Sequence, residues 1–208
     1  MYEALCGEQL DSAIQELSLL LEDRSCLSEE WLNQTNSIAV PVPDPILPAG
    51  YHAISRIIRC VCERASPDDF ILAAATPELF GEPGFYGADG TSHECDFIEK
   101  IARPLPHPFV VRFGRTTDLL ATYIDDSFCF GNAIIYIPSI GTSILSASRE
   151  DHHVVAGPRR IVECCFGHQV DQAWQTWRDG VARADPDYPV IQYLKEVSKI
   201  YERTIAPT

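Results

Sequence analysis

The chain has 208 residues, of which 46% are hydrophobic and 22% are charged, and its formal net charge is −14 at pH 7. This composition supplies enough apolar side chains for a core without disulfides, and no apolar run approaches the roughly 18 residues that a membrane-spanning helix needs. Because phosphate binding requires clustered Lys and Arg, the acidity disfavours DNA, RNA and anionic membranes as partners. We expect one domain over residues 1–208 and a cytoplasmic location, since the N-terminus lacks the charged and apolar regions of a secretory signal.

The acidic residues are concentrated in the first half of the chain. Residues 1–99 contain 18 Asp and Glu against four Arg, whereas residues 100–208 contain 12 acids and 12 bases. Two interpretations fit this asymmetry. It is either a solvated surface that keeps the protein soluble, or a docking face for a basic protein partner.

Helices dominate the prediction for the first half. Apolar residues at three- and four-residue spacing indicate an amphipathic helix over residues 8–23. Ser28 is placed to cap a short second helix through Trp31. Prolines at alternate positions predict a stiff, extended connector over residues 40–49, and another helix is expected over residues 51–65.

A possible partner-binding surface follows this helix. Residues 66–69 have the order cap, proline, acid, acid that begins a helix. The glycine-rich loop over residues 81–90 carries two aromatic rings inside an acidic rim, which is typical of a binding loop, although the same rings would also anchor a loop on the core. The predicted partner-binding residues are Asp68, Asp69, Glu78, Glu82, Phe85, Tyr86 and Asp89.

Beyond residue 108 the periodicity changes from helical to strand-like. Five strands are predicted, at residues 109–113, 119–125, 133–137, 143–148 and 153–156. The turns between them are too short for helical crossovers, so the sheet should be antiparallel. Helices are expected from Gly157 to about residue 184, with a break near Gly167, and from Pro189 onward.

These elements predict an α+β fold. Its acidic part, residues 1–102, contributes N-terminal helices. The remainder, residues 103–208, contributes a central antiparallel meander of about five strands (roughly 109–157) and C-terminal helices that pack on the sheet.

The sequence contains no motif of a known catalytic or nucleotide-binding chemistry. The cysteines are expected to be reduced thiols that behave as small buried hydrophobes, because none of them has the spacing of a zinc site. In particular, Cys60 and Cys62 would point away from each other on a helix. We therefore predict no metal and no cofactor. The eight cysteines are Cys6, Cys26, Cys60, Cys62, Cys95, Cys129, Cys164 and Cys165.

The charge distribution favours a protein-binding inhibitor. In size and charge the chain resembles bacterial immunity proteins, and this resemblance implies an antitoxin-like protein that covers a basic toxin or effector enzyme with acidic surface. Two alternatives stay open. One is an enzyme of an unrecognised family that uses the strand-end carboxylates Asp125 and Asp126, and the other is an adaptor or scaffold protein.

Overall fold

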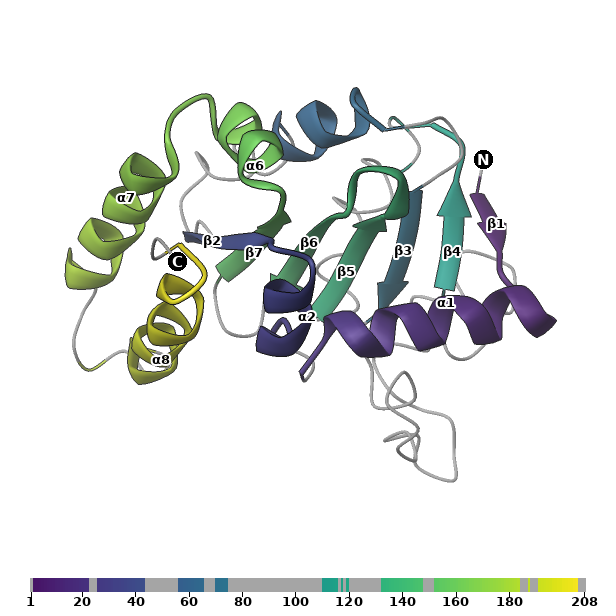
Figure 1. The fold of residues 1–208 in the computed structure, drawn as a ribbon, viewed down its shortest axis with the longest axis horizontal. Coiled ribbons are helices and arrows are strands. Elements are labelled where there is room, and N and C mark those ends of the chain that lie inside the picture. Colours follow the sequence, from purple (N-terminus) through teal and green to yellow (C-terminus); the bar gives the residue numbers. More distant parts are fainter. Residues whose placement is uncertain are drawn as a thin grey trace.

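The fold is built around an antiparallel sheet, which has seven strands within the part of the chain that the structure describes (Figure 1). The strand order is β1–β4–β3–β5–β6–β7–β2, and each neighbouring pair is antiparallel. The computed structural model describes residues 2–22, 26–43, 56–65, 70–74, 110–115, 117, 119, 132–147, 152–183, 187 and 191–205. The strands are β1 (Tyr2–Ala4), β2 (Ile38–Pro43), β3 (Phe70–Ala74), β4 (Val110–Phe113), β5 (Asn132–Ile137), β6 (Thr142–Ala147) and β7 (His152–Gly157).

Helices pack around this sheet, which confirms the predicted α+β class. Figure 1 shows α1 crossing one side of the view, α6 and the helical residues 56–62 on the opposite side, and α7 and α8 beside β2. A single 3-10 turn, η2 (Pro138–Ile140), connects β5 to β6. The α-helices with described bounds are α1 (Gly7–Leu20), α2 (Glu29–Gln34), α6 (Arg159–Phe166), α7 (Val170–Arg183) and α8 (Ile191–Glu202).

The local signals for helix starts and stops are confirmed at several positions. The Ser28 hydroxyl accepts a hydrogen bond from the Trp31 N–H at 3.3 Å, as an N-cap does. Gly167 adopts a left-handed conformation with φ 74° and ends α6, so the predicted break between the two helices is confirmed. Buried residues at helical spacing in α1, such as Ala13 and Leu17, confirm the amphipathic helix there.

Four of the predicted strands are confirmed as β4, β5, β6 and β7. The prediction that a helix begins at residues 66–69 is wrong, because residues 70–74 form the strand β3. β3 lies between β4 and β5 with its apolar side chains buried, so pairing on both edges overrides the local cap signal. The simple meander is therefore interrupted between β4 and β5. The predicted strand over residues 119–125 is wrong at its first residue, since the Leu119 N–H donates to the Arg115 carbonyl at 3.1 Å in a helical turn. Residues 120–125 lie outside the described residues.

The first part of the predicted proline connector is a strand instead. β2 pairs with β7 and forms one end of the sheet. Alternate residues direct their N–H groups to the same side of a strand, and on the outer side Ala39 donates to the Thr204 hydroxyl at 3.1 Å. The next two outward positions are Pro41 and Pro43, which have no N–H. The prolines therefore protect an edge strand from further pairing.

The helix α8 is fixed to the N-terminal part of the chain by a buried tyrosine. Tyr201 has no exposed surface, and its hydroxyl accepts a hydrogen bond from the Leu27 N–H at 2.7 Å. The same hydroxyl donates to the Cys26 sulfur at 3.4 Å. Burial, and secondarily the neighbouring Cys26, raises the pKa of Tyr201 well above its ordinary value. The phenol therefore stays protonated and joins residues that are far apart in the sequence.

Candidate functional site

The outer face of α1 carries acidic side chains and one exposed leucine. Helical periodicity turns Ala13, Leu17 and Leu20 into the core, and it turns Glu8, Asp11, Gln15 and Leu19 outward. Leu19 is 64% exposed, opposite the buried stripe. An apolar side chain within a row of acids is the composition expected of a contact surface with a polar rim.

Few positive charges lie near these acids within the described residues. The described residues 2–22 and 26–43 contain seven acidic residues and no Lys or Arg. Glu29 forms an ion pair of 3.3 Å with Arg203 from the C-terminal end, and Glu30 accepts a hydrogen bond from Gln34. The carboxylates on the outer face of α1 form no ion pair with any other described residue. We call the outward residues Glu8, Asp11, Gln15, Glu16 and Leu19 the α1 acidic face.

A hollow of about 390 Å³ lies between the α1 acidic face and the sheet. Glu8 and Glu16 line it from α1, and Ile71 and Arg112 line it from the sheet. Those two sheet residues are register partners on β3 and β4, which places them on the same face of the sheet. Two carboxylates against one guanidinium leave the hollow with an acidic balance that suits a basic side chain.

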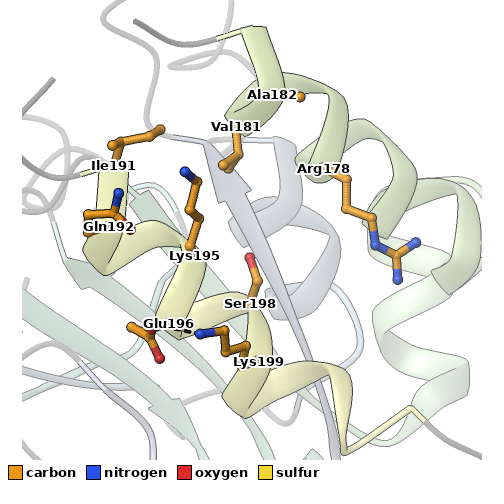
Figure 2. A pocket seen from close by; sticks show the side chains of 9 residues that line it. All are labelled: Arg178, Val181, Ala182, Ile191, Gln192, Lys195, Glu196, Ser198 and Lys199. Carbon is orange, nitrogen blue, oxygen red and sulfur yellow. Dashed lines mark hydrogen bonds and ion pairs between the residues drawn. The ribbon is translucent and has the colours of Figure 1, made fainter. Parts of the chain in front are cut away.

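A second groove, of about 550 Å³, lies between α7 and α8 (Figure 2). Its charges are largely paired, because Arg178 binds Glu202 at 2.9 Å and Lys199 binds Glu196 at 2.7 Å. In Figure 2 the Lys195 side chain points toward the space between the two helices. One unpaired ammonium in an open groove is weak evidence for a binding site, so the charge balance favours the α1 acidic face.

The opposite side of the molecule is basic, a feature that the sequence analysis did not predict. The helical segment around residues 56–65 and α6 pack together, and between them they carry five arginines against two glutamates. This segment holds three of the four arginines in the acidic half of the sequence. The described surface is therefore polarised, with acids on α1 and α2 and bases around α6. The arginines are Arg56, Arg59, Arg64, Arg159 and Arg160.

Cysteines gather on this basic side. Cys60 comes from the helical residues 56–62, whereas Cys164 and Cys165 come from α6. The Arg64 guanidinium donates to the sulfurs of both Cys60 and Cys164, at 3.0 and 2.6 Å. Cys164 is exposed, as is Cys6 at the start of α1, so the prediction that the cysteines are buried is wrong for these two. It holds for Cys26, Cys62 and Cys165, whereas Cys60 is half-buried, and Cys95 and Cys129 lie outside the described residues.

The seven predicted partner-binding residues lie outside the described part of the chain, as do Asp125 and Asp126 of the enzyme alternative. The apolar stripe predicted for α1 omits Leu19, but its exposure was not used as a sign of a binding surface. A helical wheel separates Leu19 from this stripe, since it falls on the side opposite Leu17 and Leu20. Sequence held no signal for the Cys60–Cys164 contact, whose partners are 104 residues apart.

Within the described residues, no group of three or more His, Cys, Asp or Glu is arranged to hold a metal ion. No described helix is long and apolar enough to cross a membrane. Comparison with known protein families, with curated proteins and with solved structures gives no match. Any functional conclusion must therefore come from the surface chemistry itself.

Proposed function

We propose that this chain is a protein-binding inhibitor that acts in the cytoplasm, similar in type to immunity proteins, and that it covers a basic toxin or effector enzyme with the α1 acidic face. The observation that carries the proposal is the row of carboxylates along α1, which form no ion pair with any other described residue, together with the exposed Leu19 at the end of the helix. Complementary charge raises the rate of association, and a desolvated apolar side chain at the centre slows dissociation. Nucleic acid is disfavoured as the partner, because the same acids would repel phosphates.

The partner's chemistry follows from the geometry of this face. Glu8 and Asp11 are one helical turn apart, and Glu16 extends the acidic row along the hollow beside α1. A partner with Lys or Arg side chains at similar spacing would pair with these carboxylates. Its apolar surface would cover Leu19.

The first experiment identifies the partner. The purified chain is immobilised and incubated at low salt with extract of the cells that produce it, and bound proteins are identified by mass spectrometry. We expect one stoichiometric basic protein that is released by salt. The purified partner is then assayed for its own enzymatic activity, which an equimolar amount of the chain should abolish. A partner that binds but stays fully active would favour the adaptor alternative instead.

The second experiment locates the interface. The double variant Glu8→Lys/Asp11→Lys should lower the association rate about tenfold at low salt and flatten its salt dependence, while Leu19→Ala should mainly raise the dissociation rate. The matched control, Asp171→Lys/Glu196→Lys, makes the same change in net charge on α7 and α8. Equal effects of the two double variants would mean that net charge, and not this face, governs binding.

The predicted acids outside the described residues form a separate set for the same measurement. Charge reversal at Asp68, Asp69, Glu82 and Asp89 should also slow association, and substitution of Phe85 or Tyr86 should speed dissociation. If neither this set nor the α1 set changes the kinetics, the interface lies elsewhere and the proposal fails.

A further inference from the structure

Three thiols and one guanidinium meet where the helical residues 56–62 pack against α6. Arg64 donates through Nη1 to the Cys60 sulfur at 3.0 Å and through Nη2 to the Cys164 sulfur at 2.6 Å. The Cys60 thiol also lies 3.6 Å from the Cys164 carbonyl oxygen. Both thiols are free, and Cys164 is exposed. The two sulfurs are therefore held side by side by a single cation at the surface.

This arrangement places an exposed thiol in electropositive surroundings. The thiolate, and not the thiol, is the nucleophile, and a neighbouring cation stabilises it. The interaction is reciprocal, since the charge of Cys60 is the main influence that raises the pKa of Arg64. Arg160 lies one helical turn before Cys164 and adds a second positive charge on the same face of α6. Exposed cysteines beside cations are the ones that electrophiles and oxidants attack most readily.

Cys165 has a different role in the cluster. It is buried, and burial together with a hydrogen bond to Cys60 raises its pKa well above the ordinary value. Its sulfur therefore stays protonated and donates to Cys60. Cys60 also contacts both the Arg64 guanidinium and the Cys164 backbone, at 3.0 Å and 3.6 Å, which keeps it next to Cys164.

We propose that Cys164 and Cys60 form a peroxide-sensitive thiol pair, in which Cys164 is oxidised first and Cys60 then closes a disulfide. The Cys164 thiolate attacks a hydroperoxide, the O–O bond breaks, and a sulfenic acid forms while hydroxide leaves and is protonated to water. The Cys60 thiolate attacks the Cys164 sulfur, the S–O bond breaks, and a second water leaves. In total, two thiols and one hydrogen peroxide give one disulfide and two waters.

The disulfide would have a structural consequence. It would covalently join the helical residues 56–62 to α6 and would displace Arg64 from the two sulfurs it contacts. The inference is independent of the proposed inhibitor function, because the thiol pair lies on the basic side of the molecule and the α1 acidic face lies on the other (Figure 1).

The first test maps the product. The reduced chain is treated with equimolar hydrogen peroxide at pH 7, remaining thiols are blocked, and the protein is digested without reductant for mass spectrometry. We expect a linked peptide pair that contains Cys60 and Cys164 and has lost two hydrogen atoms. In Cys60→Ser, a sulfenic acid on Cys164 should persist and be trapped by dimedone. A product that links Cys165 to either residue, or no disulfide at all, would overturn the proposal.

The second test asks whether Arg64 activates Cys164. The rate of Cys164 alkylation by iodoacetamide at pH 7 should fall about five- to tenfold in Arg64→Ala, because the thiolate loses its closest cation. The matched control is Arg59→Ala, which removes the same charge from the same segment at an exposed position. The buried Cys26 should stay unreactive in each folded variant and so reports whether the variant is folded. If Arg64→Ala and Arg59→Ala react equally at Cys164, the activation is refuted.

A third variant distinguishes a loss of thiol activation from a loss of folding. Arg64→Lys keeps the positive charge but offers one ammonium in place of the two-armed guanidinium. It should retain part of the alkylation rate at Cys164 while disulfide formation with Cys60 slows. If Arg64→Lys is alkylated and oxidised at the same rates as the unmodified chain, the contact of Arg64 with both sulfurs has no role.

Discussion

Substitution of Tyr201 by Phe isolates one buried contact between α8 and the N-terminal part of the chain. The change removes the hydroxyl that accepts from the Leu27 N–H at 2.7 Å and donates to Cys26, and it leaves the ring in place. A buried N–H without an acceptor costs about 1–3 kcal/mol. For a chain of this size a loss of 2 kcal/mol lowers the Tm by roughly 4–8 °C. Denaturant titration and thermal melting, each followed by circular dichroism, would measure both quantities.

The same variant has a distinctive pH dependence. Because burial raises the pKa of Tyr201, the folded chain keeps this proton at a pH where the unfolded chain, with an ordinary pKa near 10, releases it. The stability from this group is therefore fully present below about pH 10 and is lost as the pH rises above it. Between pH 7 and pH 11 the stability difference between the parent chain and Tyr201→Phe should narrow by about 1.4 kcal/mol.

The control is Tyr193→Phe on the same helix, where the ring is only half-buried. At pH 7 it should cost less stability than Tyr201→Phe does. If Tyr201→Phe has the same Tm as the parent chain at pH 7, the reasoning is refuted, since the buried N–H of Leu27 would then have found another acceptor. An unchanged difference at pH 11 would refute the burial of the phenol.

Two further substitutions test local features of the fold. Gly157→Ala should destabilise the chain by about 1–3 kcal/mol, because a Cβ there would lie 2.6 Å from the Thr142 hydroxyl, and Thr142→Ala in the same chain should recover part of the loss in a double-mutant cycle. If Gly157→Ala leaves the denaturation midpoint unchanged, β6 and β7 are less closely packed than described. Ser28→Ala should cost about 1 kcal/mol in denaturant unfolding, since the Trp31 N–H loses its cap, whereas Ser28→Asp should retain most of the stability.

Local chemistry determined much of the secondary structure from the sequence. The apolar spacing of α1 and α8, the Ser28 cap and the Gly167 break depend on residues within a few positions of one another, and all are readable from a single chain. The β-rich region after residue 108 can also be predicted from the sequence. β5, β6 and β7 are joined by connections too short for a helical crossover, so neighbouring strands must be antiparallel. The acidity of the first half and the absence of a catalytic motif are likewise properties of the sequence alone.

Only the tertiary structure decided which strands pair and which side chains meet. The residues before β3 locally favour the start of a helix, and β2 contains prolines, which locally disfavour a strand. Both are strands because long-range partners on the sheet outweigh local preference, with the prolines accommodated at an edge. The contact of Cys60, Arg64 and Cys164 depends on the packing of two helices that lie about a hundred residues apart. The composition shows that the chain is acidic. It does not show that the acids of α1 and the bases around α6 lie on different sides of the molecule, because the fold and not the sequence order sets which charges share a surface.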